Sequence, residues 1–150
     1  PGSSAGELFR QACLQEREPD RVGDALGRAR VRMPRYNEEE KKQRTSAIQS
    51  ALEKATDVPL RIVRCSLGLL EYTNGLVKIA NPNLVTDVGV AGLLANAALK
   101  GAMLNVEINL NCIQSKEVVN TVKEEIEKTL VRAEKLIYDI MKKVKDIMHK

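Results

Sequence analysis

The sequence predicts an all-α protein, an antiparallel bundle of several long helices. Apolar residues recur every three or four positions over long stretches, and no stretch alternates as a strand does. Aromatic residues make up only 3% of the chain, which disfavours a sheet. The long apolar stripe on Val119–Ile147 and the two-sided helix predicted at 59–79 expose more apolar surface than one thin bundle can cover, and this predicts a helix-paired homodimer or higher oligomer.

Composition divides the chain near residue 36. All seven basic residues of 1–35 are arginines, whereas thirteen of the seventeen later ones are lysines. Pro19 and Pro34 interrupt this first part, which offers two short helices, at 7–16 and 20–33. We therefore predict an atypical N-terminal segment, 1–35, followed by one helical domain, 36–150.

The first long helix is predicted to begin after Asn37, a favoured N-cap residue. Three glutamates fill its first turn, where the helix dipole stabilises negative charge, and Glu40 stands at the capping-box position. The run Thr56–Pro59 predicts that this helix ends and another begins, because proline is tolerated in a first turn.

The helix predicted from Pro59 to about residue 79 has apolar residues on two sides. One stripe has heptad spacing and a second runs beside it, so we expect this helix to pack against two neighbours. The turn Asn81-Pro82-Asn83 ends it. The first stripe consists of Leu60, Val63, Leu67, Leu70, Asn74 and Val77, and the second of Ile62, Leu69 and Leu76.

Residues 86–113 predict the central helix of the bundle. The first half is built from small or apolar residues, with no charge between Asp87 and Lys100, so neighbouring helices can approach closely on several sides. Thr86 or Asp87 is the expected N-cap. Asp87 and Asn105 are eighteen residues apart, about five helical turns, and share a face. Polar groups on a buried helix must be hydrogen-bonded within the protein or must bind a ligand.

Ser115 is the expected N-cap of a last helix that runs to about His149. Apolar residues recur along it at helical spacing, and charged residues such as Glu124 and Lys128 form i,i+4 pairs on the other side. The apolar stripe consists of Val119, Val122, Ile126, Leu130, Ala133, Ile137, Ile140, Val144 and Ile147.

Several classes of site and partner are disfavoured. The single histidine, His149, is next to last, which argues against a nucleophile–histidine pair, and no motif offers metal ligands or a phosphate-binding glycine loop. Cys13, Cys65 and Cys112 are far apart, so free thiols in the cytoplasm are expected. No signal peptide or run of eighteen apolar residues indicates a membrane. The net charge of +4 is spread out and does not indicate nucleic acid.

The chemistry that remains is acid–base catalysis by a carboxylate and hydrogen bonding by asparagine. Asp87 is the candidate acid–base group, since a carboxylate in an apolar setting can have a raised pKa. The plainer interpretation of Asp87, as a helix cap, has equal weight on spacing alone. Asn105 and Asn109 can orient a substrate, or can simply satisfy backbone groups of neighbouring helices.

Four short motifs follow one another along residues 33–150. They are MPRYNEEEKKQR at Met33–Arg44, VPL at Val58–Leu60, an asparagine turn followed by Thr86-Asp87, and NVEINL at Asn105–Leu110. In their order and spacing the chain resembles the cyclodeaminase/cyclohydrolase family of folate enzymes. That family includes the deaminase half of formiminotransferase-cyclodeaminase and the bacterial methenyltetrahydrofolate cyclohydrolase.

The resemblance implies an all-α homodimer that acts on a tetrahydrofolate, with or without a polyglutamate tail, and uses no further cofactor or metal. The reaction would be loss of ammonia from 5-formiminotetrahydrofolate to give the 5,10-methenyl compound, or hydrolysis of that compound to 10-formyltetrahydrofolate. Asp87 is then expected to be catalytic, with Asn105 and Asn109 binding the substrate. The candidates for binding the anionic glutamate tail are Arg61, Arg64 and Lys100.

Two other interpretations stay open. Family members have a Pro-Gly-Gly-Gly-Ser loop near the N-terminus, which Pro1–Gly6 does not match, and this favours a truncated, non-catalytic relative that acts as a helical dimerisation or interaction module. Saturable binding of 5-formyltetrahydrofolate would separate that module from an enzyme. The third interpretation, a basic helical nucleic-acid binder, rests on the first-segment arginines and predicts steeply salt-dependent binding.

Overall fold

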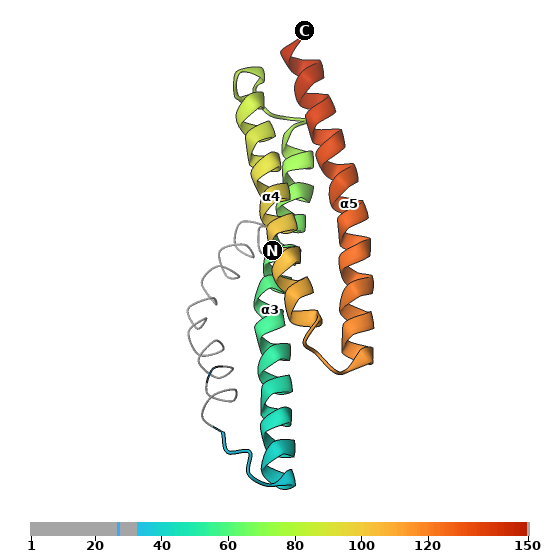
Figure 1. Cartoon of the computed structure of the whole chain (residues 1–150). Helices are drawn as coiled ribbons and strands as arrows, with labels where there is room; N and C mark the ends of the chain where they lie inside the picture. The colour runs from blue at the N-terminus through green and yellow to red at the C-terminus, as the bar shows by residue number, and fades with distance from the viewer. Residues whose placement is uncertain (1–26, 28–32, 150) are drawn as a thin grey trace, which may run out of the picture.

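The computed structural model describes residue 27 and residues 33–149. The two short helices predicted at 7–16 and 20–33 lie outside the described residues, apart from Gly27 and Met33. Within the described part the helices form an antiparallel bundle (Figure 1), which confirms the all-α prediction.

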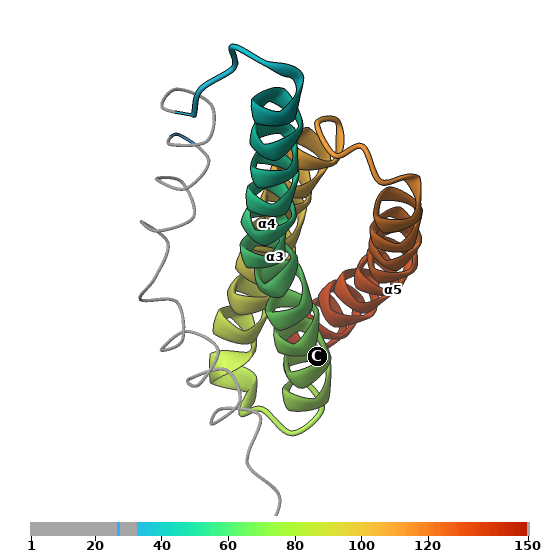
Figure 2. The same ribbon diagram turned by 90° about the horizontal axis from the view of Figure 1, so that it is seen from below.

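Three long helices make up this bundle. α3 (Glu38–Leu76) and α4 (Val85–Leu110) lie side by side and are joined through a short 3-10 helix, η1 (Pro82–Leu84). α5 (Lys116–Met148) packs on one side of the pair and diverges from it toward its own first residues (Figures 1 and 2). The bundle is therefore layered, with α3 and α4 in one layer and α5 in the other.

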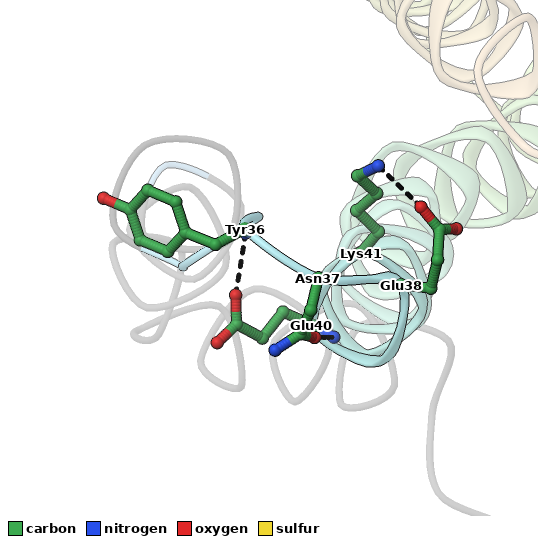
Figure 3. A network of polar contacts seen from close by, with 5 residues as sticks. All are labelled: Tyr36, Asn37, Glu38, Glu40 and Lys41. Carbon is green, nitrogen blue, oxygen red and sulfur yellow. Dashed lines mark hydrogen bonds and ion pairs between the residues drawn. The ribbon is translucent and has the colours of Figure 1, made fainter.

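The start of α3 confirms the predicted N-cap. The Asn37 Oδ1 atom accepts the Glu40 backbone N–H at 2.8 Å, and the Glu40 carboxylate accepts the Tyr36 backbone N–H at 2.8 Å (Figure 3). Lys41 Nζ lies 2.7 Å from the Glu38 carboxylate on the first turn. The first of these contacts satisfies one of the N–H groups that the first turn of a helix leaves without partners, and the second attaches the residue before the N-cap to the same turn.

The predicted helix boundary at Thr56–Pro59 is wrong, because α3 is one helix of 39 residues that contains Pro59. Proline lacks the N–H that would bond to the Ala55 carbonyl, which normally weakens a helix. Here Leu52 and Leu60, on either side of the proline, are both buried in the core, as is Pro59 itself. Packing of both halves on one side of α3 thus outweighs the loss of one backbone bond.

The core lies where the three helices meet. Leu70 of α3, Leu99 of α4 and Ile140 of α5 have no exposed surface. The stripe predicted along the second half of α3 is buried at four of its apolar positions, and the one predicted along α5 is buried at four. These residues are Leu60, Val63, Leu70 and Val77 in α3, and Ile126, Ala133, Ile140 and Val144 in α5.

Glycines let α5 approach α4 closely. A Cβ atom at Gly89 would lie 3.3 Å from Val144 Cγ2, and one at Gly92 would lie 3.4 Å from Ile137 Cδ1. Side chains at these two positions would push the helices apart. On this side of α4, the prediction that small residues serve close helix packing is confirmed.

The opposite side of α4 is not covered by any described residue, so the prediction of a helix enclosed on several sides is wrong there. Leu94 is 66% exposed and Leu104 67% exposed, and a Cβ atom at Gly101 would meet no atom within 4 Å. By length and composition alone, Pro82–Leu110 could also cross a membrane. We call this side the open face of α4; it is lined by Val90, Leu94, Ala97, Gly101, Leu104 and Ile108.

Candidate functional site

Asp87 lies in the first turn of α4 and its side chain is exposed. The helix begins two residues earlier, after Leu84, and no side chain caps it, so the predicted capping role of Thr86 or Asp87 is wrong. The reason is the 3-10 helix that leads directly into α4: its own N-cap is Asn81, whose Oδ1 accepts the Asn83 N–H at 3.0 Å. Asp87 still stabilises the helix through its dipole, but its carboxylate is free to serve another purpose.

Asn105 lies on the same edge of α4 as Asp87, and Asn109 about 40° further round. The Asn105 side chain is exposed and makes only a long contact, 3.5 Å from its Nδ2 atom to the Gly101 carbonyl. Asn109 is half-buried. Neither amide satisfies a backbone group of a neighbouring described helix, so both side chains stay candidates for binding a ligand.

Distance separates these groups within one chain. Eighteen residues of helix place Asp87 and Asn105 about 27 Å apart along the axis of α4, and Asn109 about 33 Å from Asp87. Groups that act on one reacting centre must each come within about 3 Å of it. The described chain therefore places the three predicted polar residues on one edge but does not bring them together.

The three basic candidates are held by carboxylates. Arg64 forms a two-pronged pair with Glu125 of α5, with N–O distances of 2.6 and 2.8 Å. The hydrogen bonds of this pair raise the pKa of Arg64 and lower the pKa of Glu125. The two hydrogen bonds of this pair join α3 to α5 and occupy the Arg64 guanidinium, which leaves it less available than a free arginine to bind a substrate.

The other two basic candidates have looser partners. Arg61 Nε lies 3.2 Å from the Asp57 carboxylate on the same helix, and Lys100 Nζ lies 3.4 Å from Glu134 of α5. Lys100 is about 140° round α4 from Asp87, on the side that faces α5. Among residues 33–149, the structure thus does not bring the three basic candidates together beside Asp87.

Sequence reasoning missed the contact that fixes the connection between α4 and α5. The Gln49 side chain of α3 donates from Nε2 to the Cys112 carbonyl at 3.1 Å and accepts the Gln114 N–H at 2.8 Å. This contact joins residues more than sixty positions apart, so no local pattern could reveal it. It holds the C-terminal end of α4, where Asn109 lies, against α3.

Other features of the described residues add no further site. Among residues 33–149, no group of three His, Cys, Asp or Glu side chains could hold a metal ion. Cys65 and Cys112 are not joined in a disulfide, and Cys13 lies outside the described residues. The candidate site is therefore the outward edge of α4, a carboxylate and two amides beside an apolar face.

Comparison with known proteins decides which family this helical bundle represents. A model of the formiminotransferase-cyclodeaminase family matches residues 27–128, more than half of the chain, and the match includes Asp87, Asn105 and Asn109. The chain belongs to this family. The family predicted from the VPL, Thr86-Asp87 and NVEINL motifs is thereby confirmed.

Two members of the formiminotransferase-cyclodeaminase family show how far the similarity extends. A methenyltetrahydrofolate cyclohydrolase of Methylorubrum extorquens is 34% identical over 113 residues, which are 73% of this chain and 54% of that protein. A formimidoyltransferase-cyclodeaminase of Rattus norvegicus is 31% identical over 80 residues, 53% of this chain and 15% of that protein. The chain thus spans about half the length of the first relative and a smaller part of the second.

Proposed function

We propose that this chain acts on the one-carbon unit carried between N5 and N10 of tetrahydrofolate, as a cyclohydrolase, a cyclodeaminase or both. Membership of the formiminotransferase-cyclodeaminase family supports the substrate class. The names of the two relatives described above refer to these two reactions. We further propose that the chain works as a homodimer, because the open face of α4 leaves large apolar side chains exposed.

The observation that carries the proposal is the position of Asp87. The two carboxylates of α4 are Asp87 and Glu107, and they lie about 160° apart round the helix. Asp87 is the one that shares an edge with Asn105 and Asn109. It makes no capping hydrogen bond, so its carboxylate is available for proton transfer.

In the cyclohydrolase reaction, Asp87 takes a proton from the water that attacks the bridging carbon. The resulting tetrahedral carbon then loses its bond to N5, which receives a proton as the hydroxyl becomes the formyl oxygen. One proton is released to solvent overall. General acid–base help of this kind typically contributes about a hundred- to ten-thousand-fold in rate.

In the cyclodeaminase reaction the nucleophile is N10 of the same substrate. N10 attacks the formimino carbon and loses its proton, and the formimino nitrogen gains that proton and one more and leaves as ammonia. Asp87 moves the proton between the two nitrogens. Asn105 and Asn109 bind uncharged polar groups of the substrate, and Arg61 or Lys100, whose ion pairs are looser than that of Arg64, meet the glutamate tail.

Replacing the carboxylate with an amide tests this role. Asp87→Asn is expected to lower turnover of both substrates by about a hundred- to ten-thousand-fold, while circular dichroism and 5-formyltetrahydrofolate binding stay near those of the parent chain. Glu107→Gln removes the other carboxylate of α4 and is the matched control, expected to keep full turnover. Full activity in Asp87→Asn would show that another group moves the proton.

A binding titration separates the enzyme from the non-catalytic module. Saturable binding of 5-formyltetrahydrofolate to the parent chain supports a working folate site. Absence of both binding and turnover from a folded, self-associating chain would overturn the proposed reaction and favour the helical interaction module.

A further inference from the structure

The last turn of α4 lacks the cap that ends many helices. Such a cap is a residue in the left-handed conformation, often glycine, which turns the chain and satisfies the last carbonyl groups. Among the described residues none has a positive φ, and the C-cap of α4, Asn111, is in the right-handed helical conformation. The end is tightened instead by backbone bonds that span three residues, such as the one from the Cys112 N–H to the Asn109 carbonyl at 2.9 Å. Because helix ends fray, this turn needs support from another element.

The Gln49 side chain of α3 supplies that support. Its Nε2 atom donates to the Cys112 carbonyl at 3.1 Å, and its Oε1 atom accepts the Gln114 N–H at 2.8 Å. One amide thus holds backbone groups on both sides of Ile113, whose own side chain is buried in the core. A side chain at position 49 that lacks either the donor or the acceptor cannot make both contacts.

Asn109 is connected to Gln49 through one residue. Cys112 donates its backbone N–H to the Asn109 carbonyl and accepts at its own carbonyl from Gln49. The Asn109 side chain is half-buried, and no hydrogen bond ties it to any of residues 33–149. The direction of its amide therefore depends on the backbone of the last turn of α4, which Gln49 holds.

We propose that Gln49 is a positioning residue for folate binding: it holds the last turn of α4 so that the Asn109 amide is already oriented toward an uncharged polar group of the substrate. This inference rests on the proposed function, in which Asn109 binds the tetrahydrofolate. Gln49 itself does not touch the substrate. It acts on binding through Asn109 and leaves proton transfer at Asp87, in the first turn of α4, unchanged.

Preorganisation gives such a contact its effect on affinity. An asparagine in a frayed turn holds the binding orientation for only part of the time, and the apparent Kd rises in inverse proportion to that part. The net contribution of one hydrogen bond shifts an equilibrium about two- to tenfold. Gln49→Leu should therefore raise the Kd for 5-formyltetrahydrofolate by about three- to thirtyfold, and by no more than Asn109→Ala does.

Binding and turnover together separate positioning from chemistry. Gln49→Leu should raise KM and leave kcat nearly unchanged, whereas Asp87→Asn lowers kcat. Val63→Ala is the matched control, since Val63 is 1% exposed and lies between Gln49 and the end of α3, so that its loss weakens the fold away from both ends of α4. The control should keep the parent Kd. An equal rise of Kd in both variants would make general destabilisation the cause and overturn the positioning role.

A double-variant cycle tests whether Gln49 acts through Asn109. Adding Gln49→Leu to Asn109→Ala should leave the Kd at the value of Asn109→Ala alone, because the amide that Gln49 orients is already absent. Two effects that multiply would show that the residues act independently, and this would overturn the inference.

Hydrogen exchange tests the same turn without any folate. In Gln49→Leu the Cys112 amide should exchange faster than in the parent chain, by about fivefold or more, while the buried Leu99 in the middle of α4 keeps the parent rate. Unchanged exchange at Cys112 would overturn the inference whatever the folate result. If exchange accelerates but the parent chain neither binds nor converts a folate, the proposed function fails, and the role of Gln49 in binding fails with it.

Discussion

On the covered side of α4, Leu99 has no exposed surface, whereas Leu104, five residues later on the open face, is 67% exposed. The same contrast holds for the glycines: a Cβ atom at Gly92 would touch Ile137 and Ile140, and one at Gly101 would touch nothing. Both sides are built from small and apolar residues. Composition therefore does not distinguish the side that holds the bundle together from the side that the described residues leave uncovered.

The difference between the two sides comes from α3 and α5. Both helices pack on the covered side, where the Arg64–Glu125 pair joins α3 to α5 and the Gln49 contact joins α3 to the connection between α4 and α5. The polar residues that attach these helices therefore differ from the polar residues that have no such structural contact and remain available to bind a ligand. Asp87, Asn105 and Asn109 belong to the second group.

Truncating one leucine on each side should give the largest difference. Leu99→Ala leaves a cavity in the core and should lower the free energy of unfolding by about 2–5 kcal/mol. Leu104→Ala removes an exposed side chain and should change it by no more than about 0.5 kcal/mol in the monomer. Urea denaturation followed by circular dichroism, at protein concentrations where sedimentation shows the monomer, measures both. Similar losses from the two variants would mean that the open face is covered in the folded chain.

Glycine substitutions should change the stability of the protein in opposite directions on the two sides of α4. Gly92→Leu forces a large side chain against Ile137 and Ile140 and should destabilise the protein by about 1–3 kcal/mol. Gly101→Ala meets no atom and should stabilise the monomer by about 0.5–1 kcal/mol, because alanine loses less chain entropy in a helix. Melting temperatures in dilute solution give both signs. A stabilised Gly92→Leu variant would contradict the close contact with α5.

Loss of the Gln49 contact should have a smaller effect, confined to the connection between α4 and α5. Gln49→Leu removes two hydrogen bonds and should cost about 1–2 kcal/mol. Hydrogen exchange of the Gln114 amide should accelerate, since that N–H loses its acceptor. Gln43→Leu on the exposed side of the same helix is the control and should leave the exchange rate unchanged.

We expect the smallest effect from the Arg64–Glu125 pair, which should make the free energy of unfolding depend on pH. The pair lowers the pKa of Glu125, so its contribution is present above the unfolded-state pKa of about 4.3 and is lost as pH falls through the folded-state pKa. Because both side chains are partly exposed, the contribution should stay below about 1 kcal/mol. Between about pH 5 and pH 3, the parent chain should lose more stability than Glu125→Gln. Equal losses would show that the pair contributes nothing.

Local signals predicted the ends of the helices well. Asn37 and Ser115 cap α3 and α5 as their side chains suggested, and the Asn81-Pro82-Asn83 turn lies where it was expected. Pro59 misled for a physical reason, since burial of its neighbours on both sides outweighs one missing backbone bond. The cap predicted at Asp87 was wrong for a different reason, because the preceding 3-10 helix makes α4 begin two residues earlier.

The candidate site was less predictable than the fold. Spacing alone placed Asp87 and Asn105 on one face, and the structure keeps them on one edge. It could not show that this edge is exposed, because small apolar residues pack equally well inside a bundle and between two copies. Nor could it foresee that Arg64 is held by Glu125, which depends on the position of α5.

Adding the same leucine to each side of α4 tests most directly whether the two sides differ. Ala95 is 3% exposed and faces the core, and Ala98, three residues later, is exposed. Ala95→Leu should lower the unfolding free energy of the monomer by about 1–3 kcal/mol, and Ala98→Leu should leave it within about 0.5 kcal/mol while weakening self-association. Equal destabilisation of the monomer by both variants would contradict the open face on which the proposed site and interface depend.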